Sequence, residues 1–138
     1  MVVHVRLKVK SNRGSLKDLI VLVNGGAHSP EPVLVVDEKL ARELGYESGQ
    51  PVEASIADTT REVYLVRNAV QITLLGEEDE ELSKIKAHLV IHPNLEEPLI
   101  TDTTIDEVGI QVISFGKGLW KHVKDPPNKV RKSALKQN

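Results

Sequence analysis

The chain has 138 residues, a formal net charge of −2 at pH 7 and no cysteine. This length suits one domain, and the lack of cysteine excludes disulfide bonds, thiolate nucleophiles and thiolate metal sites. The near-balanced charge gives the body of the protein no electrostatic preference for nucleic acid. Charged residues alternate with valine from the start and no long apolar segment follows, so we expect no signal peptide and no membrane span. The expected protein is soluble and cytoplasmic.

The first half of the chain is dominated by short apolar runs. Aromatic residues make up only 3% of the sequence, so the core must be built from valine, leucine, isoleucine and alanine, a composition that favours sheets. Residues 2–10 alternate apolar with basic or histidine side chains and predict a strand with one wet face. Leu19–Val23 is uniformly apolar and predicts a strand buried on both faces.

This second strand ends at a polar turn, Asn24-Gly25-Gly26-Ala27. The two glycines allow the backbone to turn sharply and to approach whatever it faces. Asn24 is therefore presented at the end of a rigid strand. Because Asn-Gly is also the commonest hairpin signal, a simple turn with no site is the alternative interpretation.

The remaining elements follow from periodicity and from capping residues. Glycine and cap residues predict two short helices, and a polar turn at Asp58-Thr59-Thr60 predicts a long hairpin. The expected fold is all-β with one or two short helices. In order, the segments are the strand Val33–Val36, the helix Glu38–Leu44, the hairpin Pro51–Leu75, the strand Ile85–Ile91, the helix Thr101–Val108 and the strands Ile110–Ile113 and Leu119–Trp120.

Two parts of the chain differ in composition. Residues 1–123 carry the predicted elements and form the expected domain, whereas residues 124–138 hold two prolines and scattered basic residues. We expect this basic tail to be disordered. Such a cluster can contact phosphates, but it lacks the interleaved aromatic residues that stack on bases. The composition favours a solubilising tail over a nucleic-acid contact.

The order of the motifs resembles the small retropepsin-like aspartic proteases of archaea and bacteria, single-domain β-barrels that pair into dimers. In that family an apolar strand runs into Asp-Thr-Gly-Ala, and Asn24 to Ala27 stand in the matching place. Asp58 and Thr59 resemble the tip of the family's flap hairpin. Gly118-Leu119-Trp120 resembles a common ending of the family.

A second motif of the family is two apolar residues and a glycine before a short helix, which Leu99-Ile100-Thr101 resembles. The resemblance implies a retropepsin-like acid-protease barrel and a homodimer. It also implies binding residues at Asp58, Thr59, Leu99, Ile100 and Thr101 beside the catalytic motif of Asn24, Gly25, Gly26 and Ala27.

The catalytic motif departs from the family at its acid. An aspartic protease uses two carboxylates that share one proton, one from each half of the dimer. Asn24 has an amide in place of this acid, and an amide neither accepts nor releases a proton in the working pH range. Gly25 replaces the family's threonine, and Thr101 replaces its second glycine. We therefore predict a proteolytically inactive dimer that holds an extended peptide by strand addition.

Three other interpretations stay open. Deamidation of Asn24 would restore an aspartate, which the intact mass of aged protein tests. Asp58 or Asp102 could supply the missing carboxylate to a weakly active peptidase. The third interpretation is a nucleic-acid-associated module that acts through the basic tail.

No cofactor or metal is expected. His88 and His92 are four residues apart, but the apolar residues between them indicate a strand, where the rings would lie about 13 Å apart. One ion cannot bind both. Asp102 and Asp106 have the same spacing near the start of a predicted helix, where they are better explained as cap and dipole partners.

Overall fold

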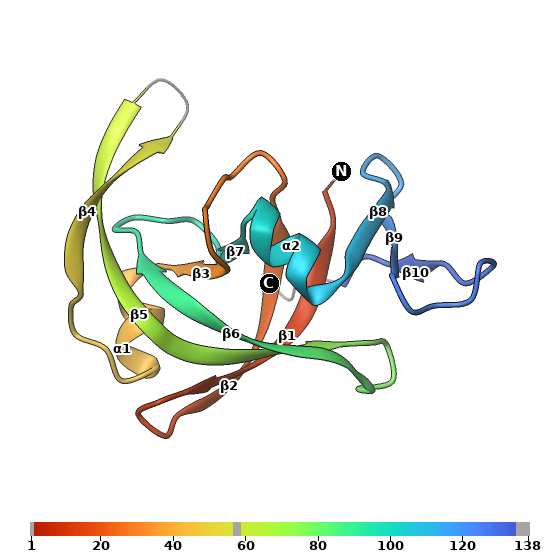
Figure 1. The fold of residues 1–138 in the computed structure, drawn as a ribbon, viewed down its shortest axis with the longest axis horizontal. Coiled ribbons are helices and arrows are strands. Elements are labelled where there is room, and N and C mark those ends of the chain that lie inside the picture. Colours follow the sequence, from red (N-terminus) through yellow and green to blue (C-terminus); the bar gives the residue numbers. More distant parts are fainter. Residues whose placement is uncertain (1, 57–58, 135–138) are drawn as a thin grey trace.

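The computed structural model describes residues 2–56 and 59–134. These residues form mostly strands with two short helices, α1 (Glu38–Glu43) and α2 (Asp102–Val108), which confirms the prediction of a mostly β protein (Figure 1). No helix in the described ranges is long and apolar enough to cross a membrane. The strands are β1 (His4–Ser11), β2 (Leu16–Val23), β3 (Val33–Val36), β4 (Gln50–Ile56), β5 (Thr59–Leu75), β6 (Glu81–Ile91), β7 (Leu99–Ile100), β8 (Ile110–Ser114), β9 (Leu119–His122) and β10 (Arg131–Lys132).

Most strands belong to one sheet with the order β1-β2-β7-β3-β6-β5-β4, and β1 pairs additionally with β5. The short strand β7 lies between β2 and β3, although it follows them by more than sixty residues in the sequence. It runs parallel to β2 and antiparallel to β3. A smaller sheet has the order β10-β9-β8. The insertion of β7 brings the start of α2 to the loop that follows β2.

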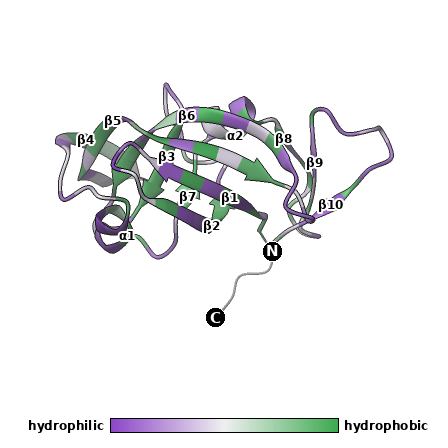
Figure 2. Ribbon diagram, turned by 90° about the horizontal axis from the view of Figure 1, so that it is seen from below, coloured by the Kyte–Doolittle hydropathy of each residue, from purple (hydrophilic) through white to green (hydrophobic). Residues whose placement is uncertain are grey.

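The core is aliphatic, as the composition predicts. Along β1 the side chains of Val5, Leu7 and Val9 are at most 1% exposed, while Lys10 is exposed. The same alternation of hydrophobic and hydrophilic residues is visible along the strands in Figure 2. One side of β1 therefore packs inward and the other is directed towards solvent.

The second strand differs from its expected burial. Val21 and Val23 are buried, but Leu19, Ile20 and Leu22 are only half-buried. The prediction that both faces of this strand are covered is therefore wrong. An unbroken apolar run does not reveal whether anything packs on its second face.

Capping residues set the helix ends close to the predicted positions. The carboxylate of Asp37 accepts the N–H of Leu40 at 2.8 Å and starts α1. The second helix, α2, ends at Gly109, which adopts a left-handed conformation with φ of 85°. A Cβ on this glycine would lie 2.8 Å from Nε2 of His122, so both the conformation and the packing require glycine here.

The C-terminal segment is part of the fold as far as residue 134, so the prediction of a disordered tail from residue 124 is wrong over this range. β10 pairs with β9, and the N–H of Ala134 donates to the carbonyl of His4 at 2.8 Å. Arg131 is 3% exposed and donates two hydrogen bonds of 2.8 Å to the carboxylate of Asp125. Its guanidinium also lies 5.6 Å from the ring of Trp120. Arg131, one of the basic residues behind the prediction of a disordered tail, is thus buried and holds the C-terminal segment against the rest of the fold.

The pairing of Asp125 with Arg131 predicts a pH dependence of stability. Hydrogen bonds from Arg131 lower the pKa of Asp125 from its ordinary value of 3.8 to about 2. Because the folded pKa is below the unfolded one, the stabilisation is complete above pH 3.8 and is lost as the pH falls towards 2. At 1.36 kcal/mol for each pKa unit, the pair contributes about 2 kcal/mol.

Asp125→Asn is expected to remove this part of the pH dependence. The measurement is the free energy of unfolding from urea denaturation of both proteins between pH 2 and pH 5. The wild type should lose its advantage over the variant as the pH falls through this window. An advantage that stays constant down to pH 2 would show that the pair does not titrate there.

Candidate functional site

The loop after β2 holds Asn24 in a compact turn. Its backbone N–H donates to the carbonyl of Ile100 at 3.2 Å, and its own carbonyl accepts the N–H of Ala27 at 3.1 Å. The side-chain oxygen accepts the N–H of Gly26 at 3.1 Å. No described residue accepts a hydrogen bond from the side-chain NH₂ of Asn24. The half-buried amide therefore keeps two donors for a group outside the described chain.

Parallel pairing places the two halves of the candidate site side by side. Leu22 is in register with Leu99, and Val23 with Ile100. The residues that follow each strand, Asn24 and Thr101, therefore leave the sheet at the same edge. Of the predicted binding residues, Leu99 is half-buried, whereas Ile100 and Thr101 are at most 3% exposed. The side chain of Ile100 packs in the core and is not available to a ligand.

Asp102 fastens the loop after β2 to the start of α2. One carboxylate oxygen accepts the N–H of Ser29 at 3.0 Å, and the other lies 3.0 Å from Nδ1 of His28. The backbone N–H of Asp102 donates to the carbonyl of Ala27 at 2.9 Å. Hydrogen bonds from the backbone N–H groups of Ser29 and Thr103 lower the pKa of Asp102.

These contacts keep Asp102 ionised and engaged with its own loop. A member of an acid dyad shares its proton with a second carboxyl, whereas the carboxylate of Asp102 has its hydrogen bonds with His28, Ser29 and Thr103. The arrangement disfavours the alternative in which Asp102 replaces the missing acid. It supports the role of a partner at the first turn of α2, where the side chain of the N-cap Thr101 makes no capping hydrogen bond.

Hydroxyl groups continue this connection into the core. Oγ of Ser29 lies 2.6 Å from Oγ1 of Thr101, which lies 3.0 Å from Oγ1 of Thr104. The hydroxyl of Thr104 accepts the N–H of Val33 at 2.8 Å and donates to its carbonyl at 2.9 Å. Thr101, which replaces the family's glycine, is therefore a buried member of a polar chain that links α2 to the start of β3.

Removing the hydroxyl of Thr104 should loosen this junction. Thr104 is completely buried, and Thr104→Val keeps its shape while leaving the N–H of Val33 without its acceptor. An unsatisfied buried donor costs about 1–3 kcal/mol, so the free energy of unfolding should fall by that amount in urea denaturation. The matched control is Thr60→Val on the exposed part of β5, which should change stability by less than about 0.5 kcal/mol. Equal effects of the two substitutions would contradict the assigned role.

The glycines of the turn are not required by the fold. Neither Gly25 nor Gly26 has a positive φ. A Cβ on Gly25 would meet no atom within 4 Å, and one on Gly26 would meet only Oδ1 of Asn24 at 3.4 Å. Both glycines are exposed. The sharp turn expected from these glycines is therefore made without the conformations that only glycine favours.

Asn24-Gly25-Gly26-Ala27 forms a turn, closed by the hydrogen bond from the N–H of Ala27 to the carbonyl of Asn24 at 3.1 Å, but it is not the turn of a two-residue hairpin. A two-residue hairpin would join paired antiparallel strands and would place a positive φ at both central residues. Here β7 separates β2 from β3, and the turn has no positive φ. The Asn-Gly pair is part of a longer loop that faces outward.

The hairpin predicted to carry the flap is present as β4 and β5, which pair from Gln50 with Leu65 to Ile56 with Thr59. It extends towards the same side of the molecule as the loop after β2, at the top of Figure 1. Asp58 lies outside the described residues. Thr59 begins β5.

The two candidate metal histidines have separate partners. Nδ1 of His88 accepts the N–H of Asn68 at 2.8 Å, and its Nε2 lies 3.2 Å from a carboxylate oxygen of Glu31. Nδ1 of His92 lies 2.8 Å from the carbonyl of Pro93. Across the described ranges no group of three or more histidine, cysteine or acidic residues could hold a metal ion.

Sequence reasoning missed three residues of the site. His28 and Ser29 belong to the loop that contacts Asp102, and Thr104 connects α2 to β3. Their partners are more than seventy residues away, so no local pattern reveals them. The Thr-x-x-Thr spacing of Thr101 and Thr104 at the start of a predicted helix was the only signal in the sequence.

Comparison with known proteins adds no assignment: no model of a protein family matches this chain, and no curated protein matches it.

Proposed function

We propose that this chain is a proteolytically inactive, retropepsin-like homodimer that binds extended peptides next to Asn24. The order of the sequence motifs resembles the retropepsin-like family, and the proposal applies this resemblance to the residues around the loop after β2. In it, the amide of Asn24 takes the position of the catalytic acid. The side chain that would move a proton is replaced by one that can only form hydrogen bonds.

The observation that carries the proposal is the pair of glycines that the fold does not need. Gly25 and Gly26 have ordinary φ values and space for a side chain. Glycine in such a place is explained when another backbone must approach closely. The free NH₂ of Asn24 lies beside them and can donate to a peptide carbonyl or to the amide oxygen of a second copy.

Two features of the sheet support the proposed architecture. The β1–β5 pairing links the first strand of the large sheet to its sixth, as a barrel requires. The β4–β5 hairpin extends on the same side as the loop that holds Asn24 (Figure 1). An extended peptide between hairpin and loop would be held chiefly by backbone hydrogen bonds.

The test uses a library of fluorescein-labelled octapeptides, fluorescence anisotropy and mass spectrometry of the peptides after incubation. The wild type should bind a subset of the peptides and leave them intact. Gly25→Val should keep the thermal midpoint of the wild type and lose the binding. The matched control is Gly116→Val, since Gly116 is also exposed with open space around its Cβ position.

Three results would contradict the proposal. Cleaved peptides with an intact wild-type chain would show that the acid is not missing. Unchanged binding by Gly25→Val would show that no backbone approaches this glycine. The absence of any peptide binding by the wild type would remove the proposed ligand.

A further inference from the structure

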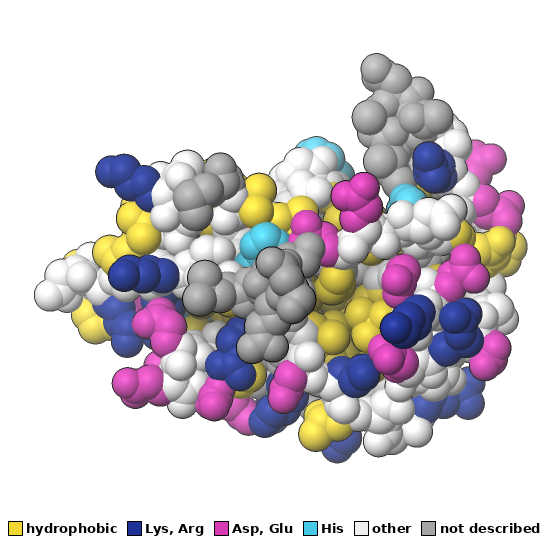
Figure 3. Space-filling model, turned by 180° about the vertical axis from the view of Figure 1, so that it is seen from behind, with side chains coloured by type: hydrophobic (Ala, Val, Ile, Leu, Met, Phe, Trp, Pro, Cys, Tyr) yellow, Lys and Arg dark blue, Asp and Glu magenta, His cyan; other side chains and the backbone are white. Residues whose placement is uncertain are grey.

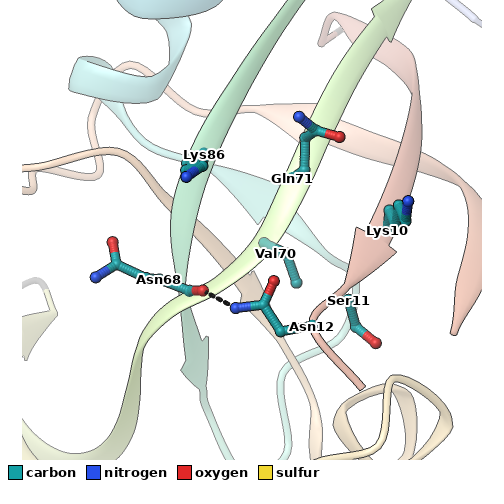
Figure 4. A pocket seen from close by; sticks show the side chains of 7 residues that line it. All are labelled: Lys10, Ser11, Asn12, Asn68, Val70, Gln71 and Lys86. Atoms are coloured by element: carbon teal, nitrogen blue, oxygen red, sulfur yellow. Dashed lines mark hydrogen bonds between the residues drawn. The ribbon is translucent and has the colours of Figure 1, made fainter. Parts of the chain in front are cut away.

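A cavity lies at the opposite end of β2 from Asn24. It has a volume of about 440 Å³ and opens on the outer side of β1, β5 and β6 (Figure 4). Lys10 at its edge is in register with Leu16, the first residue of β2, whereas Asn24 follows the last one. Eight strand residues separate the two places, about 25 Å at 3.3 Å for each residue. The cavity and the Asn24 loop are therefore separate sites.

Every polar side chain that lines the cavity can donate a hydrogen bond, and none is acidic. The lining residues are Lys10, Ser11, Asn12, Asn68, Val70, Gln71 and Lys86. The whole chain has 20 acidic and 18 basic residues, and on the face in Figure 3 basic side chains lie next to acidic ones. The lining of the cavity has two lysines and no carboxylate, so it differs from the mixed charges on that face.

Sheet register puts the two lysines on either side of Gln71. Lys10 is directly opposite Gln71 on β1 and β5, and Gln71 is directly opposite Lys86 on β5 and β6. Directly opposite residues share a face, with about 5 Å between neighbouring strands. The Cα atoms of the lysines are thus about 10 Å apart, and their flexible side chains can reach one ligand above Gln71.

Two residues further along the strands, a second pair of lysines has the same arrangement, but an acidic residue neutralises their charge. Lys8 and Lys84 flank Thr73, and both pair with the carboxylate of Glu81, at 3.5 and 3.6 Å. No described carboxylate pairs with Lys10 or Lys86. The two ammonium groups at the cavity therefore repel each other without a counter-charge from the described chain.

A buried serine, Ser11, ends β1 next to the cavity. Ser11 is 3% exposed, and its Oγ accepts the N–H groups of Arg13 and Ser15 at 3.2 and 3.1 Å. Both acceptor positions of the hydroxyl are thereby used within the turn, which fixes the backbone that follows Lys10. Asn12 donates to the carbonyl of Asn68, which holds the rim of the cavity together (Figure 4).

We propose that this cavity binds a small, soluble polyanion that carries phosphate groups. Two lysines that no described carboxylate pairs with supply the charge, and the side-chain amides at the cavity supply hydrogen bonds to phosphate oxygens. The concave shape and the volume of about 440 Å³ fit a ligand of small-molecule size. This site is independent of the peptide site proposed above.

The experiment titrates the full chain with inorganic diphosphate and follows the side-chain amide signals of Asn12, Asn68 and Gln71 by NMR. These signals should shift with a saturable dependence on diphosphate. A charge-assisted hydrogen bond corresponds to about a tenfold change in affinity, so Lys10→Gln and Lys86→Gln should each weaken binding by about that factor. Added salt should weaken it further.

The matched controls are Lys8→Gln and Lys84→Gln, which remove the same charge from the row paired with Glu81. They should leave the affinity for diphosphate within about twofold, because their charge is already compensated. Gly25→Val should also bind diphosphate normally, so failure of the peptide site and of this site can be told apart.

Several outcomes would overturn the proposal. Linear, unsaturable shifts would show only diffuse attraction, and equal losses in the control lysine variants would show that net charge alone decides. Saturable binding of citrate without binding of diphosphate would contradict the phosphate assignment. Binding to vesicles of anionic phospholipid without binding to free diphosphate would contradict a soluble ligand.

Discussion

On the proposed function, Asn24→Asp should give this chain peptidase activity with an acidic pH optimum. The substitution exchanges an amide for a carboxyl of nearly the same size at the end of β2. In a symmetric dimer it would place two carboxyls together, which share one proton and activate water. General acid–base catalysis alone is worth about 10²–10⁴ in rate, so product should rise from none to a readily measured rate.

The measurement is the initial rate with fluorogenic peptides between pH 3 and pH 7, for wild type and variant at equal concentrations. The matched control is Asn94→Asp, an exposed turn residue with φ of 67° that tolerates either side chain. Intact mass must show that residue 24 of the wild type is still an amide. If folded, dimeric Asn24→Asp is as inactive as the wild type, the amide does not occupy the position of an acid.

Arg131→Met should destabilise the fold by about 3–5 kcal/mol, the usual cost of breaking a buried ion pair from one side. The guanidinium holds the carboxylate of Asp125, whose side chain is 8% exposed, and lies 3.6 Å from a carboxylate oxygen of Glu80. These contacts raise the pKa of Arg131, with the hydrogen bonds to Asp125 as the main cause. Without the arginine, the buried charge of Asp125 loses its main partner and keeps only the backbone N–H of His122, at 2.9 Å, as a hydrogen-bond donor.

The urea midpoint of unfolding measures this effect, with Lys132→Met as control because Lys132 is the exposed neighbour on β10. The double variant Arg131→Met with Asp125→Leu should recover part of the loss, since it removes both charges. A midpoint for Arg131→Met equal to that of the control would show that the C-terminal segment contributes little to the stability of the fold.

Local patterns in the sequence predict much of this fold. The alternation of residues 2–10 gives the buried face of β1, and Asp37 with Gly45 marks both ends of α1 within one residue. Gly109 marks the end of α2, because glycine readily adopts the left-handed conformation found there. Such signals depend on neighbours in the chain, so the sequence contains all the information they need.

The errors concern interactions between distant residues. The insertion of β7 between β2 and β3 depends on pairing across more than sixty residues. Composition suggested a disordered tail because it counts lysine and arginine alike, whereas Arg131 is buried against Asp125 and Trp120. The periodicity of Leu19–Val23 could not show that one face of β2 lacks a full cover.

The candidate site shows the same division. Motif order pointed to Asn24 and to the segment from Leu99 to Thr101, and parallel pairing of β2 with β7 brings these segments together. The partners of Asp102 in the loop, His28 and Ser29, came only from the structure. The two glycines were expected for their conformational freedom, but the structure shows that the backbone does not use it.

The most direct test of the central claim is a cross-link between two copies of residue 24. The natural chain has no cysteine, so Asn24→Cys introduces one thiol, and Ser48→Cys places a control thiol at an exposed position elsewhere on the surface. If two Asn24 side chains face each other across a dimer, mild oxidation or a short bis-maleimide should join Asn24→Cys into covalent dimers and leave Ser48→Cys monomeric. No cross-link at position 24, with light scattering that gives the mass of one chain, would contradict the account.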